Sequence, residues 1–172
     1  MKSSSCDATK EPFIGNRKFL FLELRGDVQM THEEKVLLYF QDKFHCSQSV
    51  LAAYAEELGL TEEQALKIAY CLNSGMRKGE VCGACSGALL VLGLKYGQCQ
   101  KDDLDSRTRA NQKTVEFLER FEKENGSYIC NDLLHCDIST AEGVQYAMEN
   151  NCFTEVCPKM VASAVKILEE MG

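Results

Sequence analysis

Four of the ten cysteines in this chain of 172 residues stand where a helix is expected to begin. They are Cys46, Cys82, Cys130 and Cys157. The first turn of a helix carries unpaired N–H groups and the positive end of the helix dipole, and both stabilise a thiolate. The thiolate is the form of cysteine that attacks disulfides or binds metal ions. Four such placements in one small domain predict a shared redox or metal site, provided that the helix starts converge.

The spacing of these cysteines differs from that of the common metal-binding and redox motifs. They are separated by 36 (46 to 82), 48 (82 to 130) and 27 (130 to 157) residues, unlike the local C-x-x-C pairs of zinc fingers and bacterial ferredoxins. Cys82 and Cys85 do form one C-x-x-C, in CGAC. A thioredoxin-type interpretation would require a βαβ unit around it, whereas the neighbouring sequence predicts helix. The motif stays compatible with dithiol chemistry, in which Cys82 attacks and Cys85 or a distant cysteine resolves.

Length and composition indicate a single globular domain. Hydrophobic residues make up 45% of the chain and charged residues 26%, close to the globular average. The net charge of -7 argues against nucleic-acid binding, which needs a basic face. No apolar run approaches the ~18–20 residues of a membrane span, and no secretory signal is seen, so a cytoplasmic location is expected. Cysteine clusters in cytosolic proteins are more often metal-binding or catalytic than disulfide-bonded.

The elements that must position the cysteines are predicted to be helices. Capping boxes at Thr31, Thr61 and Ser139, each with Glu or Gln three residues later, mark three helix starts. The expected fold is all-α, a single-domain helical bundle of about seven helices with an irregular N-terminal segment. The helices are expected near residues 31–44, 47–58, 61–75, 82–97, 105–125, 139–148 and 158–171, with a short one near 130–135.

The helix expected at residues 82–97 is apolar on every side and is therefore predicted to be central and buried. Gly83 and Gly87 cost helix stability there, roughly 1 kcal/mol each. Glycine at such positions suggests the close approach of a bound cluster or of another helix. Both interpretations stay open, so Gly83 and Gly87 are candidate cofactor-binding residues as well as candidate packing residues.

Hydrophobic periodicity assigns further core positions. In the helix expected at 105–125, the residues Val115, Leu118 and Phe121 are predicted to face inward. Cys71 lies mid-helix between apolar neighbours and is expected in the core. Cys6 and Cys99 are expected at the surface.

Residues 1–29 differ in composition from the rest of the chain. They are expected to be an N-terminal extension or leader, with a possible short strand at residues 19–24. Residues 31–172 are expected to form the all-helical, cysteine-rich domain.

The cysteine pattern resembles that of a family of redox-active proteins known as C_GCAxxG_C_C. The C-G-A-x-x-G element reads from Cys82 to Gly87, and Cys46 in FHCSQSV corresponds to the upstream cysteine. The downstream cysteines correspond to Cys130 in GSYICNDLL and Cys157 in EVCPKMV. The resemblance covers residues 31–172. A similar cysteine region occurs in split-Soret cytochromes beside an iron–sulfur centre, which implies that these four cysteines hold an iron–sulfur cluster for electron transfer.

Other interpretations of the same cysteines stay open. One is a metal-free thiol–disulfide oxidoreductase that uses Cys82 with Cys85 or a distant cysteine. Another is a structural zinc site, or a plain helical protein-interaction module whose buried thiols only pack. Cys136 and Cys152 lie near the downstream pair and are expected to be structural. No histidine follows a C-x-x-C, so covalent haem is not expected.

The sequence also leaves the partners open. A redox protein needs an electron partner, which the sequence does not name, and a homodimer is an alternative assembly. Beside the upstream cysteine, His45 could tune the site, and Gln48 could donate a hydrogen bond to a cluster sulfur.

Overall fold

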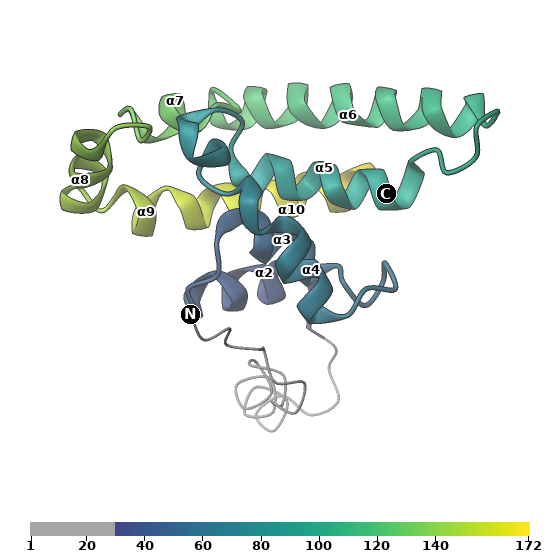
Figure 1. Cartoon of the computed structure of the whole chain (residues 1–172), viewed down its shortest axis with the longest axis horizontal. Coiled ribbons are helices and arrows are strands. Elements are labelled where there is room, and N and C mark those ends of the chain that lie inside the picture. The colour runs from purple at the N-terminus through teal and green to yellow at the C-terminus, as the bar shows by residue number, and fades with distance from the viewer. Residues whose placement is uncertain (1–29) are drawn as a thin grey trace, which may run out of the picture. The chain divides into compact units, whose positions relative to one another are not determined.

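The computed structural model describes residues 30–172, and these residues form helices without a strand (Figure 1). The all-α class predicted from the sequence is confirmed. The helices are α2 (His32–Gln41), α3 (Cys46–Ala53), α4 (Glu62–Ala69), α5 (Gly83–Tyr96), α6 (Leu104–Asn125), α7 (Cys130–Leu134), α8 (Ala141–Glu149), α9 (Cys152–Glu155) and α10 (Cys157–Met171), with the short turns η1 (Tyr70–Leu72) and η2 (Gly75–Gly79) between α4 and α5. The predicted N-terminal extension, with its strand at residues 19–24, lies outside the described residues.

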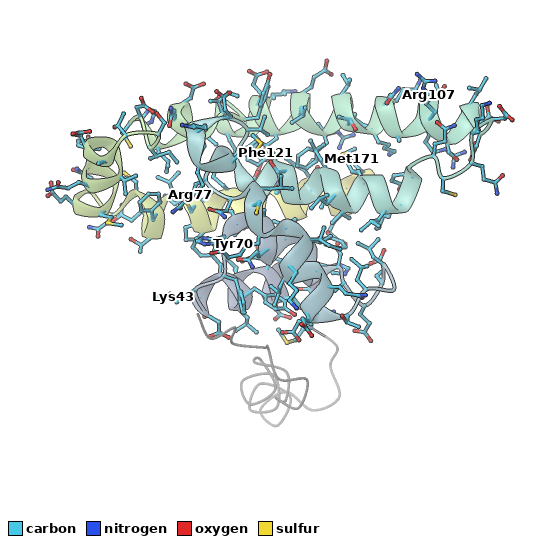
Figure 2. The ribbon with its side chains drawn as sticks, in the orientation of Figure 1. Lys43, Tyr70, Arg77, Arg107, Phe121 and Met171 are labelled. Carbon is cyan, nitrogen blue, oxygen red and sulfur yellow. The ribbon has the colours of Figure 1, made fainter. Side chains whose placement is uncertain are left out.

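The helices pack around α5 and α10. Helix α10 contacts α2, α3, α5 and α6, and α5 packs between α3 and α6. Figure 1 shows α5 and α6 as an antiparallel pair, with α7, α8 and α9 gathered at one end. Helix α5 is buried along its first two turns, as predicted, whereas its last turn is at the surface, with Leu94 50% exposed. The core is completed by the aromatic pair Phe117 and Phe121 of α6, the second of which is labelled in Figure 2.

Local hydrogen bonds set several helix starts where the sequence predicts them. At α2, the Thr31 hydroxyl accepts the N–H of Glu34, whose carboxylate in turn accepts the N–H of Thr31. The same reciprocal box begins α4. The prediction that Ser139 caps α8 is wrong by one residue, because the hydroxyl of Thr140 accepts the N–H of Gly143 instead (3.0 Å). The N–H of Ser139 donates to the carboxylate of Asp137 (3.0 Å), so Ser139 belongs to the preceding turn.

Two predicted core residues are at the surface. Val115 is 55% exposed, whereas Phe117 is 0% exposed. Two residues correspond to about 200° around an α-helix. Phe117 and Val115 therefore lie on nearly opposite faces of α6, and the burial of Phe117 leaves Val115 exposed to solvent. Cys71 is also exposed. The regular helix ends at Ala69 and continues as the tight turn η1, which carries Cys71 away from the core.

No helix among residues 30–172 combines the length and the apolar character that a membrane crossing requires.

Candidate redox site

Four cysteines line one cavity of about 670 Å³. Cys46, Cys130 and Cys157 are the first residues of α3, α7 and α10, and Cys82 is the N-cap of α5. Helices that are far apart in the sequence therefore place their N-terminal ends at one point. The sequence predicts helix-start cysteines, and the structure brings all four of them together.

A single antiparallel bridge between Val81 and Ile129 holds two of the cysteines side by side. The N–H of Cys82 donates to the carbonyl of residue 128 (2.8 Å), and the N–H of Cys130 donates to the carbonyl of residue 80 (2.7 Å). The two backbone segments therefore fix each other's position directly before α5 and α7 begin. The thiol of Cys130 is hydrogen-bonded to the sulfur of Cys82.

The other two cysteines form a second pair. The thiol of Cys46 is hydrogen-bonded to the sulfur of Cys157, and this bond is the main reason why the pKa of Cys46 lies well above its usual range. Burial and the neighbouring thiols act in the same direction. The site thus consists of two close pairs, Cys46 with Cys157 and Cys82 with Cys130.

Cys82 is the thiol most readily ionised in this group. Hydrogen bonds from the thiols of Cys130 and Cys85 lower the pKa of Cys82 well below its usual range, and the backbone N–H groups of Ala84 and Cys85 add to the effect. Burial opposes the shift but does not cancel it. The pKa of Cys130 is raised mainly by its hydrogen bond to Cys82, and that of Cys85 mainly by burial. One thiolate surrounded by donors is the arrangement of a reactive or metal-binding cysteine.

Gly83 and Gly87 allow α5 to pack closely on α3. A Cβ on Gly87 would lie 2.8 Å from the carbonyl oxygen of Ser47 and 2.9 Å from Cβ of Val50. A Cβ on Gly83 would lie 3.2 Å from Cβ of Cys46. The glycines therefore let the backbone of α5 approach α3, and this approach brings Cys46 near Cys82. The helix-packing interpretation of both glycines accounts for these contacts.

Several sequence candidates lie outside the cavity that the four cysteines line. Cys136 and Cys152 are partly buried at the edge of the apolar cluster that includes Cys130 and Cys157. Cys99 is exposed, as predicted. Within the described part of the chain, these cysteines do not line the cavity.

The two polar residues beside Cys46 have other partners. The side-chain amide of Gln48 donates to the carbonyl of Leu66 (3.0 Å), and its oxygen accepts the N–H of His45 (3.1 Å). The amide of Gln48 is thus engaged away from the sulfurs. His45 lines the cavity as the N-cap of α3, and burial, followed by the charge of Arg77, lowers its pKa.

Sequence reasoning missed the turn that forms another wall of the cavity. Asn73, Ser74 and Arg77 line it. Ser74, Met76 and Arg77 have φ values of 52°, 54° and 62°, a left-handed backbone that costs roughly 1–2 kcal/mol per residue without glycine. The only signal in the sequence is the pair of glycines in GMRKG, which predicts a turn but not its handedness.

The donor set fits a soft metal centre. Thiolates are the ligands of iron–sulfur clusters and of zinc. Among residues 30–172, no three His, Cys, Asp or Glu side chains lie close enough together to hold one metal ion. The close contacts join Cys46 with Cys157 and Cys82 with Cys130, and all four cysteines line the same cavity.

Residues 44–171 match the family described as "Putative redox-active protein (C_GCAxxG_C_C)". No curated protein and no solved structure matches the chain.

Proposed function

Because the chain belongs to the C_GCAxxG_C_C family of redox-active proteins, we propose that its four helix-start cysteines hold an iron–sulfur cluster for electron transfer. The ligands in this proposal are Cys46, Cys82, Cys130 and Cys157. The observation that carries it is their meeting in one cavity from four different helices. When bound, such a cluster supplies one-electron transfer.

The residues around the sulfurs suit this role. The N–H groups of Ala84 and Cys85 donate to the sulfur of Cys82, and N–H···S bonds of this kind tune the reduction potential of a cluster. The N-terminal ends of α3, α5 and α10 present their positive dipole ends to the thiolates. Apolar side chains around the cavity limit the access of water, which is a second determinant of potential.

A single zinc ion and an iron–sulfur cluster differ in how far apart they hold four thiolates. Four thiolates on one zinc ion lie about 3.8 Å from one another, since each Zn–S bond is about 2.3 Å long. A polynuclear cluster holds its ligands further apart. Both kinds of centre use thiolate ligands, and the analysis of iron, sulfide and zinc distinguishes them.

The test is anaerobic purification and reconstitution, followed by analysis of iron, sulfide and zinc. We expect bound iron and sulfide in the native chain and a loss of both in the Cys46→Ser, Cys82→Ser, Cys130→Ser and Cys157→Ser variants. Cys71→Ser is the matched control, because Cys71 is exposed and outside the cavity. A native protein that stays colourless and retains no iron after reconstitution would refute the proposal, and stoichiometric zinc would replace it.

A second function, thiol–disulfide exchange, is favoured by the low pKa of Cys82 and its contacts with Cys85 and Cys130. The Cys82 thiolate would attack a substrate disulfide, form a mixed disulfide and release one substrate thiolate. The thiolate of Cys85 or Cys130 would then attack the Cys82 sulfur of the mixed disulfide and release the second substrate thiolate. The substrate disulfide gains two electrons, and the protein is left with one internal disulfide.

This alternative is tested on metal-free, reduced protein by titration against mixtures of reduced and oxidised dithiothreitol. It predicts one reversible internal disulfide that includes Cys82. The alternative fails if Cys82→Ser leaves the redox titration unchanged.

A further inference from the structure

The cavity has more room and a different character than four sulfur ligands need. Its volume of about 670 Å³ lies in the range of pockets for small molecules, roughly 300–1,000 Å³. Away from the cysteines it is lined mainly by apolar side chains, which include Phe40, Phe44, Val144, Phe153 and Met160. Such a wall suits an apolar or aromatic ligand body.

Away from its cysteines, the cavity lining carries positive charge although the chain as a whole is acidic. The whole sequence has 26 acidic and 19 basic residues, yet the lining residues include the cations Lys43 and Arg77 and none is an Asp or Glu. Figure 2 shows Lys43 and Arg77 in the half of the view that contains α7, α8 and α9, whereas Arg107 lies at the opposite end. A positive lining in an acidic protein selects an anionic ligand.

Asn73 supplies an unused hydrogen-bond acceptor in the same wall. It is only 3% exposed, and its Oδ1 has no hydrogen-bond partner among the described residues. Its amide group donates to the carbonyl of Tyr70, which leaves the oxygen as the free end. Buried polar atoms are nearly always paired, so this acceptor points to a ligand that carries a donor.

The strained turn joins these two features. Asn73 directly precedes a segment rich in left-handed residues to which Arg77 belongs, and the N–H of Arg77 donates to the carbonyl of Asn73 (3.2 Å). Strained backbone of this kind clusters at active sites and ligand clamps. In this protein the turn places Asn73 and Arg77 in the same wall of the cavity.

We propose that the cavity binds a small organic carboxylate with an apolar ring body and a hydrogen-bond donor. Arg77 and Lys43 bind the carboxylate, the oxygen of Asn73 accepts from the donor, and the apolar wall holds the ring. A ligand there lies beside the four sulfurs, so it is a candidate substrate of the redox site. The role of the ligand as a redox substrate rests on the proposed function, whereas the binding of the ligand does not.

The experiment measures the binding of hydroxynaphthoate to the full chain by calorimetry, under reducing conditions, before and after reconstitution with iron and sulfide. Two matched probes separate the contacts: hydroxynaphthamide lacks the charge, and naphthoate lacks the hydroxyl donor. We expect each to bind about tenfold more weakly, since a hydrogen bond to a charged or buried partner is worth about that factor.

Variants connect each loss to a residue. In Arg77→Met, hydroxynaphthoate should bind about as weakly as hydroxynaphthamide does to the native protein. In Asn73→Leu, the preference for hydroxynaphthoate over naphthoate should disappear; circular dichroism shows whether this variant still folds. If Asn73→Leu does not fold, the comparison of the two probes on the native protein decides the role of the donor. Arg107→Met is the control, because Arg107 is an exposed cation outside the cavity.

The outcomes separate this proposal from the proposed function. Binding of the probe by a protein that never retains iron would support the carboxylate site and refute the cluster. Retention of iron without binding of the probe would support the cluster and refute the carboxylate site. Equal affinity for hydroxynaphthoate and hydroxynaphthamide, or an equal loss in Arg77→Met and Arg107→Met, would overturn the carboxylate site.

Discussion

The substitution Gly87→Ala tests whether the close approach of α3 and α5 holds the site together. The added Cβ would lie 2.8 Å from the carbonyl oxygen of Ser47 and 2.9 Å from Cβ of Val50, where ordinary contact begins at 3.4 Å. The two helices must therefore separate by about half an ångström. Overpacking of this kind typically costs about 1–3 kcal/mol of unfolding free energy.

Gly93→Ala in the same helix is the matched control. Gly93 belongs to α5 as well, and a Cβ there would meet nothing within 4 Å. Both variants gain the same helix propensity, roughly 1 kcal/mol. The gain cancels in the comparison, so Gly87→Ala should be less stable than Gly93→Ala by the packing cost alone, about 1–3 kcal/mol.

Urea unfolding of reduced, metal-free protein, followed by circular dichroism, measures this difference. With a denaturant dependence of about 1–3 kcal/mol per molar, the midpoints should differ by about 1 M. Equal midpoints, or a higher midpoint for Gly87→Ala, would refute the packing argument. A second readout concerns the site: because α5 carries Cys82 and α3 carries Cys46, Gly87→Ala should retain less iron on reconstitution than Gly93→Ala.

Three further predictions concern the fold, and urea unfolding checks each of them. Thr140→Ala should lower the unfolding free energy by about 1 kcal/mol, and Ser139→Ala by less, because the hydroxyl of Thr140 caps α8; equal losses would contradict the assigned cap. Phe117→Ala should cost about 3–5 kcal/mol and Val115→Ala less than about 0.5 kcal/mol, since only the first is buried; a large loss in Val115→Ala would contradict the orientation of α6. Glu57→Gln should cost under about 1 kcal/mol at neutral pH, as befits a half-exposed ion pair. The pKa of this carboxyl is lowered from 4.5 mainly by its lysine partner, so the difference from the native chain should vanish as the pH falls through the lowered value, and a difference that persists in acid would contradict the ion pair.

Features that depend on a few neighbouring residues could be predicted from the sequence. The capping box at Thr31 needs only a carboxylate three residues later, and the structure contains both of its hydrogen bonds. Ser139 shows where such local reasoning fails. The pattern predicted Ser139 as the cap, but the N–H of Ser139 donates to Asp137, and the hydroxyl of the next residue, Thr140, caps the helix. The bond to Asp137 belongs to a turn whose geometry the spacing of residues does not reveal.

The candidate site depended on information that no local pattern contains. Helix-start cysteines are readable because a helix start has a sequence signature. Their convergence depends on the bridge between Val81 and Ile129 and on the packing of α5 against α3. The left-handed turn with Asn73 and Arg77 was also out of reach, because residues other than glycine rarely adopt this backbone and no propensity predicts it. The predicted helix starts and the family resemblance together supplied the grouping of the four cysteines, but neither shows how the helices pack.

The pairing of Cys46 with Cys157 has a consequence for the timing of assembly. The two residues are 111 positions apart (46 to 157), and a ribosome adds about 5–20 residues per second. After Cys46 has been synthesised, on the order of ten seconds pass before its partner exists. The complete set of four thiols is therefore available only late in synthesis, and any cofactor that needs all four must be delivered after nearly the whole helical domain has been made.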